Sequence, residues 1–196
     1  MKLICIGDSF TRGFGVKKKE NWVSHINIDG VEVMNMGING DTTSGMLARF
    51  RDDVILEKPN YVLITGGTND FISGSDCSIP QNNYMAMVHQ AFHSGIIPVV
   101  GIEPGFSPEN VRADWAVFSD FQKVFDKQLQ LGEWLKKMCK TFGVFYIDFY
   151  EGLNLVTQNA SEKAMFIDGL HLTAEGHKLI AGIVNKELQN IIFGKD

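Results

Sequence analysis

Five short runs of apolar and β-branched residues stand out along the chain. They cover residues 3–6, 31–36, 61–65, 97–102 and 144–149. Each run is continuously apolar rather than alternating in polarity, which is typical of strands that are buried on both faces of a sheet. The pattern therefore predicts five buried strands.

Segments with the spacing of amphipathic helices lie between these runs. The longest covers residues 118–142, and the others place apolar residues at Met46, Leu47, Phe50, Val54, Met85, Val88, Phe92, Leu179, Ile183, Val184, Leu188 and Ile191. Thr173 is suited to cap the last helix. Strands that alternate with helices indicate right-handed crossovers and a parallel sheet with helices on both sides. The predicted fold class is α/β.

Polar residues follow the predicted strands, at the edge where ligands of such sheets bind. Asp8 and Ser9 come directly after the first strand, residues 35–40 end or follow the second, and Asn69 and Asp70 follow the third. A serine before a helix is often only an N-cap, and an aspartate there often holds a turn. Ser9 is nevertheless the candidate nucleophile, because a matching base lies near the end of the chain.

That base is His171, which among five histidines is the one with a carboxylate three residues before it, Asp168. A serine hydroxyl is a weak nucleophile until an imidazole takes its proton, and a carboxylate fixes the imidazole tautomer. We therefore predict a triad of Ser9, His171 and Asp168. The N–H groups of Ser9 and Gly37 and the side-chain amide of Asn69 are the expected oxyanion donors.

These blocks resemble those of the GDSL family of lipases and esterases, the SGNH hydrolases, over nearly the whole chain. They are Gly7-Asp8-Ser9-Phe10, an Asn-x-Gly block with Gly37, Gly67-Thr68-Asn69-Asp70, and the final block from Asp168 to His171. The resemblance implies a flavodoxin-like three-layer α/β/α sandwich, with five parallel strands in the order 2-1-3-4-5. It also implies hydrolysis of acyl esters or thioesters through an acyl-serine, without a metal or organic cofactor. The segments 7–13 and 40–45 are similar to the thioesterase and lysophospholipase branch of the family.

Length and charge narrow the expectations further. The 196 residues suit one domain, residues 1–196, and a net charge of −5 gives no basic face for nucleic acid. Three widely spaced cysteines predict neither a disulfide framework nor a zinc site. The first apolar run is too short for a signal peptide or a membrane span, so we predict a cytoplasmic protein. The sequence leaves the oligomeric state open.

The substrate pocket is the least constrained part of the prediction. Phe10 beside the nucleophile and the apolar residues Leu153 and Phe166 are candidates to line it. The segment 153–166, which also holds Leu155, Val156 and Met165, lacks clear periodicity and is expected to be a loop, either an acyl-pocket wall or a segment packed back on the sheet. The segment 106–120 with Trp115 is a candidate lid.

Two other functions share some of these features. A metal-dependent phosphoesterase would also use polar residues at strand ends, and a flavodoxin-like binding module would share the strand arrangement without a triad. His89 and His93 have the spacing of metal ligands on one helix, but no third ligand is near them in sequence. We expect these two histidines to form an exposed, solvated face.

Overall fold

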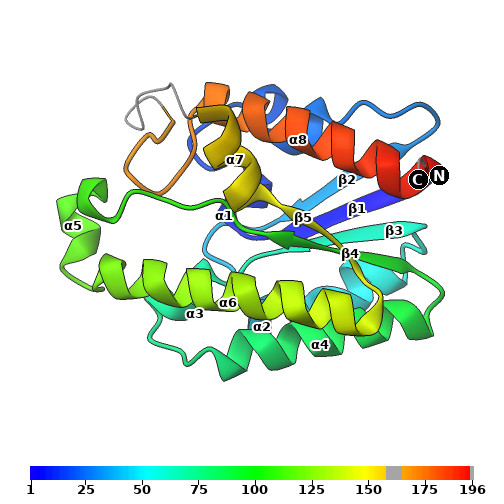
Figure 1. Cartoon of the computed structure of the whole chain (residues 1–196), viewed down its shortest axis with the longest axis horizontal. Helices are drawn as coiled ribbons and strands as arrows, with labels where there is room; N and C mark the ends of the chain where they lie inside the picture. Colours follow the sequence, from blue (N-terminus) through cyan, green and yellow to red (C-terminus); the bar gives the residue numbers. More distant parts are fainter. Residues whose placement is uncertain (158–164, 195–196) are drawn as a thin grey trace.

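A five-stranded parallel sheet forms the centre of the computed structural model, which describes residues 1–157 and 165–194 (Figure 1). The strand order is β2-β1-β3-β4-β5, and every neighbouring pair is parallel. The strands are β1 (Lys2–Gly7), β2 (Glu32–Gly37), β3 (Tyr61–Thr65), β4 (Ile97–Ile102) and β5 (Phe145–Asp148). The predicted fold class and strand order are confirmed.

Helices cover both faces of this sheet and complete three layers (Figure 1). One face packs against α2 (Thr43–Phe50), α4 (Ser78–His93) and α6 (Phe121–Phe142). The other face packs against α7 (Phe149–Thr157), α8 (Ala174–Phe193) and a 3₁₀ turn, Trp22–His25. Three short helices, α1 (Ser9–Arg12), α3 (Thr68–Ile72) and α5 (Ala113–Ala116), lie beyond the carboxyl ends of the strands.

The two edge strands differ from the prediction of strands buried on both faces. The central strand β3 is buried at all five positions, whereas β2 is partly exposed along its length and β5 buries one residue fully. An edge strand has a neighbour on one side alone, so the helices above and below do not enclose it completely. The apolar runs predicted the strands but not their position in the sheet.

Two helix boundaries also depart from the predicted ones. The helix α6 begins after Asp120, whose carboxylate accepts from the Lys123 N–H, and Phe118 lies outside it with 86% of its surface exposed. The segment expected to be a loop from residue 153 is helical as far as Thr157, and residues 158–164, part of the same prediction, lie outside the described residues. Thr173 caps α8 as predicted, by accepting from the Gly176 N–H.

The register of the strands brings the segments that carry the candidate site residues to the same edge of the sheet. Gly7 at the end of β1 is paired with Gly37 of β2 and Thr65 of β3, and Thr65 is paired with Gly101 of β4. The chain segments that follow these positions therefore emerge side by side at one edge of the sheet. No helix in the described ranges is both long and apolar enough to cross a membrane.

Candidate active site

Ser9 is the first residue of α1, immediately beyond strand β1. The Asp8 side chain caps this helix by accepting from the Phe10 N–H at 2.9 Å. The helix ends after one turn, because Gly13 takes a left-handed conformation (φ 83°). A turn of this kind leaves the Ser9 hydroxyl at the rim of the sheet, where the sequence prediction placed it.

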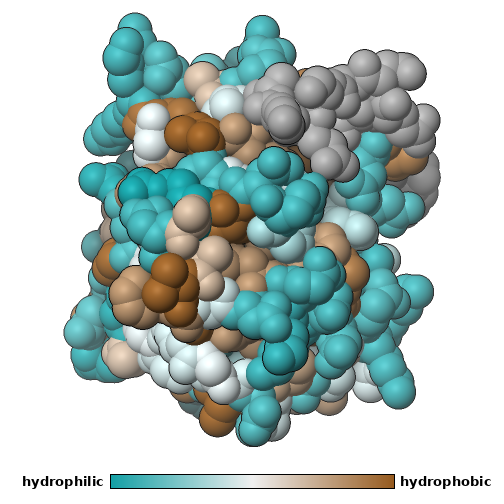
Figure 2. All heavy atoms as spheres, turned by 90° about the vertical axis from the view of Figure 1, so that its left-hand side faces the viewer, coloured by the Kyte–Doolittle hydropathy of each residue, from teal (hydrophilic) through white to brown (hydrophobic). Residues whose placement is uncertain are grey.

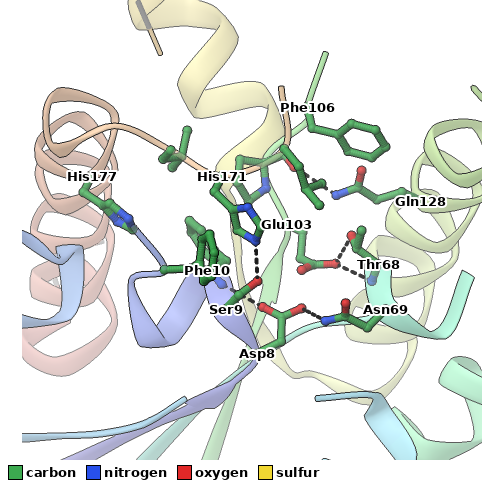
Figure 3. Close-up of a pocket in the computed structure, with 14 residues that line it drawn as sticks. Asp8, Ser9, Phe10, Thr68, Asn69, Glu103, Phe106, Gln128, His171 and His177 are labelled. Atoms are coloured by element: carbon green, nitrogen blue, oxygen red, sulfur yellow. Dashed lines mark hydrogen bonds between the residues drawn. The ribbon is translucent and has the colours of Figure 1, made fainter. Parts of the chain in front are cut away.

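The three residues of the predicted triad lie together in the structure, and Figure 3 shows His171 pointing at Ser9. The Nε2 atom of His171 lies 3.1 Å from Ser9 Oγ, and its Nδ1 atom lies 2.9 Å from Asp168 Oδ2. These distances are within hydrogen-bond range on both sides of the imidazole. With Nδ1 protonated toward Asp168, Nε2 is free to accept the Ser9 proton.

The Asp168 carboxylate is fixed by its own turn. Its Oδ1 atom accepts from the backbone N–H groups of Leu170 and His171, at 3.1 and 2.8 Å. Burial opposes the charge, but these backbone bonds and the His171 imidazole together lower the pKa of Asp168 below its usual value. Asp168 is therefore a carboxylate that accepts the Nδ1–H bond at neutral pH.

The segment after β4 holds this turn against the rest of the domain. The Ser107 N–H donates to the Gly169 carbonyl at 2.8 Å, and the Arg112 N–H donates to the Asp168 carbonyl at 3.1 Å. Gly169 has φ 84°, and a Cβ there would lie 2.3 Å from the backbone of Asn110. Glycine is thus required at position 169, because the two segments touch at that point.

Two aromatic rings border the catalytic imidazole. The centroid of the Phe14 ring lies 4.2 Å from that of His171, and Trp115 meets the imidazole edge-on at 5.4 Å. Trp115 belongs to α5, inside the segment 106–120 that the sequence suggested as a lid. The structure places this segment beside the triad, and its role as a lid stays a prediction.

The backbone N–H of Gly37, a predicted oxyanion donor, is not placed to donate to an oxyanion. Its N–H donates to Asn35 Oδ1 at 2.9 Å, and a Cβ at position 37 would lie 2.3 Å from the Arg12 backbone nitrogen. Gly37 is therefore a packing residue, which lets α1 lie directly against β2. Gly40, three residues later, has φ 74° and lines the same hollow as Ser9.

The side chain of Asn69, at the start of α3, points toward Ser9 and Asp8 (Figure 3). Its amide nitrogen donates to Asp8 Oδ2 at 3.1 Å and to the Asp41 carbonyl at 2.9 Å. The next residue, Asp70, accepts from the N–H and the hydroxyl of Thr43 and so joins α3 to α2. Asp8 and Asp70 thus hold neighbouring elements in place.

Two adjoining hollows open around the triad. A narrow slot of about 40 Å³ is lined by Ser9, Phe10, His171 and Leu172, among others. A wider hollow of about 440 Å³ also reaches Ser9 and His171. Its other walls are mostly apolar: Phe14, Asn39, Gly40, Asn69, Ile72, Trp115, Phe118, Ser119, Phe121 and Leu170. Figure 2 views the molecule from this side and shows apolar surface across the centre of the face.

The other two predicted pocket residues lie elsewhere. Leu153 and Phe166 line a separate hollow of about 300 Å³ with Met165, and Leu155 projects into solvent with 63% of its surface exposed. The side chain of Val156 lies outside the described residues. Of the three proposed substrate contacts, Phe10 alone lines a hollow that reaches Ser9.

His177 also lines the slot, although the sequence offered no partner for it. Its ring stacks on Phe10 with centroids 6.4 Å apart, and 1% of its surface is exposed. Burial, with smaller contributions from His25 and His171, lowers the pKa of His177 to about 4. His177 is therefore a neutral packing residue beside the nucleophile at neutral pH.

The remaining histidines and the cysteines show no metal-binding arrangement. His89 and His93 are exposed on α4, as expected. No group of three or more potential metal ligands occurs within residues 1–157 and 165–194. Cys5, Cys77 and Cys139 are free thiols.

Comparisons with known proteins show the family to which the chain is similar. A model of the GDSL-like lipase/acylhydrolase family matches residues 5–179. The chain is similar to esterase TesA of Pseudomonas aeruginosa, with 31% identity over 120 residues that make up 57% of this chain and 60% of the relative. It thus spans about 60% of that relative's length. An arylesterase of Vibrio mimicus is 26% identical, over 95% of this chain and 88% of the relative.

Solved structures agree on the fold. A lipolytic protein of the G-D-S-L family from Veillonella parvula superposes with a TM-score of 0.80. It is 24% identical in sequence, and the match covers 95% of this chain and 97% of that one. This likeness supports the three-layer architecture.

Proposed function

Since this chain belongs to the GDSL-like lipase/acylhydrolase family, we propose that it hydrolyses carboxylic esters with Ser9 as the nucleophile, His171 as the base and Asp168 as the orienting carboxylate. The family match agrees with the predicted class, a GDSL-type ester hydrolase. It does not favour the metal-dependent phosphoesterase or the flavodoxin-like binding module.

One observation carries the assignment of the residues. Ser9 Oγ, the His171 imidazole and Asp168 Oδ2 form one hydrogen-bonded chain with distances of 3.1 and 2.9 Å, although 162 positions separate Ser9 from His171 in sequence. A serine that merely caps a helix needs no imidazole, and an imidazole that merely fills space needs no carboxylate. The combination supports proton transfer away from Ser9.

The reaction proceeds in two halves. In the first, Ser9 Oγ attacks the ester carbonyl while His171 Nε2 takes the hydroxyl proton. The C–O bond to the alcohol then breaks, His171 returns that proton to the leaving oxygen, and an acyl-Ser9 ester remains. In the second half, water gives its proton to His171 and attacks the acyl carbon, and Ser9 regains a proton as the acid leaves. Asp168 stabilises the imidazolium in both halves.

The oxyanion of each tetrahedral intermediate is assigned to three donors. These are the backbone N–H of Ser9, the backbone N–H of Gly40 and the amide of Asn69. Within the described residues, neither backbone N–H donates to another protein group. Gly40 takes the place that the sequence prediction gave to Gly37, because Gly40 borders the hollow, whereas Gly37 packs against Arg12 and donates to Asn35. The Asn69 amide lines both hollows and donates to Asp8 and Asp41 in the free protein, and one of these two bonds gives way to the oxyanion.

Replacement of Asn69 by alanine is expected to lower kcat by about 10²-fold, since one oxyanion donor is typically worth that much. KM should change far less, because the charge that Asn69 stabilises appears in the transition state. The measurement is steady-state hydrolysis of a nitrophenyl ester. Asn83→Ala is the matched control and should keep the wild-type kcat, because the Asn83 amide on α4 donates to Thr43 and Ser44 of α2 and does not line either hollow. An unchanged kcat in Asn69→Ala would remove Asn69 from the oxyanion hole.

The hollow of about 440 Å³ is proposed to hold the acyl group. Its apolar walls suit a hydrocarbon chain or an aromatic ring better than a lone acetyl group, which would leave most of the wall uncovered. Thioesters carry the same acyl group on the same carbonyl carbon, so they fit equally well. Rates on an oxygen ester and a thioester of one matched acid decide between the two.

A series of nitrophenyl esters from acetyl to decanoyl tests the acyl site. Each methylene that enters the apolar hollow is worth about 0.8 kcal/mol, or roughly fourfold in kcat/KM, until the hollow is filled. Phe118→Ala is expected to reduce the gain for longer chains. Val117→Ala is the control, because Val117 is similarly exposed but does not line the hollow. Equal rates along the series, in all three proteins, would contradict this acyl site.

We further propose that residues 1–196 form one hydrolase domain in the cytoplasm. The sheet draws on strands from β1 to β5, and α8 near the end of the chain packs across it, which supports a single unit. Fractionation of cells that produce the protein from its own gene tests the location. Recovery in the membrane or outside the cell would refute it.

A further inference from the structure

Two carboxyl groups lie buried side by side beneath the nucleophile. Asp8, directly before Ser9, has 2% of its surface exposed, and Glu103, directly after β4, has 8%. Both side chains line the narrow slot beside Ser9, and the charge of Glu103 acts on Asp8. Figure 3 shows them meeting between α1 and α3. Neither group belongs to the triad, and the proposed reaction gives neither of them a proton-transfer role.

Each carboxyl holds the start of one catalytic helix. Asp8 accepts from the Phe10 N–H of α1 at 2.9 Å and from the Asn69 amide at 3.1 Å. Glu103 Oε2 accepts from the N–H of Thr68 at 3.0 Å and from its hydroxyl at 2.8 Å. The pair therefore links the helix that carries the nucleophile to the helix that carries an oxyanion donor.

A proton on one of the two buried groups would let them hydrogen-bond to each other. Carboxylate oxygens only accept hydrogen bonds, so two carboxyl groups can bond to each other only when one of them carries a proton. Within the described residues, neither Asp8 nor Glu103 forms an ion pair with a lysine or arginine. Arg49, which donates to the carbonyl of Gly7 next to Asp8, donates otherwise to Asp41 and Asp53.

The groups around the pair make a second negative charge unfavourable. The titratable and charged side chains that face it are Asp41, Arg49, Asp70, Tyr84, His171 and His177. Burial, followed by the charge of Glu103, raises the pKa of Asp8 well above its usual value. Burial also raises the pKa of Glu103, against the opposing effect of its bonds from Thr68.

We propose that Asp8 and Glu103 share one proton at neutral pH and act as a positioning pair, which fixes Ser9 and Asn69 relative to each other. The positioning role in turnover rests on the proposed function. The shared proton is measured without any substrate, so a failure of the shared proton is distinguishable from a failure of the proposed function.

The proton is counted from the pH dependence of unfolding. In the unfolded chain both carboxyls are ionised above about pH 5.5, given ordinary pKa values of about 3.9 and 4.3. The folded-state pKa is raised, so the stability that the proton contributes is complete at acidic pH and declines as the pH rises. In the wild type, the pair then increases the unfolding equilibrium constant about tenfold for each pH unit over which the folded pair keeps its proton, and the proposal places neutral pH in that range.

Glu103→Gln removes this dependence while it keeps the hydrogen bonds. The glutamine oxygen accepts from Thr68, and its amide donates to an ionised Asp8 without a titrating proton. The ratio of the wild-type to the Glu103→Gln unfolding constant, from urea titrations, should therefore rise about tenfold per pH unit. Glu133→Gln, which removes an exposed carboxylate, should keep the wild-type slope. Parallel slopes in wild type and Glu103→Gln would overturn the shared proton.

The positioning role is tested by comparing kcat and KM among three variants. Glu103→Ala leaves Thr68 and Asp8 without their partner, and a misplaced Asn69 is expected to lower kcat by about 10²-fold with little change in KM. Glu103→Gln should restore kcat to within a few-fold of the wild type. Asp8→Asn should not, because its amide meets the Asn69 amide donor to donor. Equal losses in the alanine and glutamine variants would overturn the positioning role.

The wild-type protein provides a measurement that needs no folded variant. The shared proton gives a carboxylic-acid C=O stretch in the infrared spectrum of the native protein at pH 7, which disappears when the chain is unfolded in urea at the same pH. A native spectrum without this band contradicts the proposal even if Glu103→Gln fails to fold.

Discussion

Ser9→Ala is expected to lower kcat/KM by about 10⁵–10⁶-fold while the fold stays intact. Without Oγ there is no nucleophile, and no acyl-enzyme forms. What remains comes from the oxyanion donors and the binding hollow, which act on direct attack by water. The fold should survive, because α1 is capped by Asp8 and not by Ser9, whose side chain bonds to His171 alone in the described residues.

The measurement is single-variant kinetics on a nitrophenyl ester, with circular dichroism to follow the fold. Ser44→Ala is the matched control, since Ser44 is exposed on α2 and bonds to Asn83. It should keep the wild-type rate. Turnover by Ser9→Ala within tenfold of the wild type would refute the proposed nucleophile.

The second large effect is expected for Asp168→Asn, about 10³–10⁴-fold in kcat. The asparagine Oδ1 can keep the backbone bonds from Leu170 and His171, so the turn should stay in place. Its Nδ2 then faces the imidazole and donates to Nδ1, which moves the imidazole proton to Nε2. An Nε2 that carries a proton cannot accept the one from Ser9.

The pH profile separates this explanation from simple misfolding. The wild-type reaction needs a neutral imidazole that carries its proton on Nδ1, because that form accepts the proton of Ser9. In Asp168→Asn the rate should stay low throughout, since a neutral imidazole in the wrong tautomer is still no base toward Ser9. Leu170 and the rest of the turn are unaffected by the variant, so thermal unfolding should shift little. A wild-type profile with near wild-type rates would contradict the orienting role of Asp168.

The sheet was predictable because the burial of apolar side chains dominates the formation of its strands. Residues 61–65 and 97–102 are continuously apolar, and the observed strands β3 and β4 have the same limits. Phe118 misled the helix prediction because it has the right spacing for α6, although the helix begins only after the Asp120 cap, which follows Phe118. Periodicity records which residues are apolar, but a single capping bond sets the boundary.

The closeness of Ser9, Asp168 and His171 was predictable for a different reason. Asp168 and His171 are close in sequence, and Ser9 directly follows a strand, so each carries a local signal. Gly37 matches the Asn-x-Gly block of the family resemblance, and for that reason the sequence predicts Gly37 and not Gly40 as the donor. The difference lies in the backbone: Gly37 is still paired within β2, whereas Gly40 has φ 74° in the loop beside Ser9. The turn residues Asp41 and Thr42 after Gly40 were the available signal.

The pairing of Asp8 with Glu103 had no signal in the sequence. The two residues are 95 positions apart, and they meet because β1 and β4 both flank β3 in the sheet. Leu153 illustrates the same limit, since its apolar character fits a pocket wall, yet α7 turns it toward a different hollow. Contacts that depend on strand order become visible only in the fold.

The covalent intermediate at Ser9 is the central claim, and labelling by an ester-like phosphonate tests it most directly. The phosphorus atom takes the place of the carbonyl carbon, and the leaving group departs as Ser9 Oγ attacks. The account predicts one adduct per chain, on the peptide that contains Ser9, formed in step with the loss of esterase activity and slowed strongly in Asp168→Asn. An adduct on another residue, or complete loss of activity with Ser9 unmodified, would contradict it.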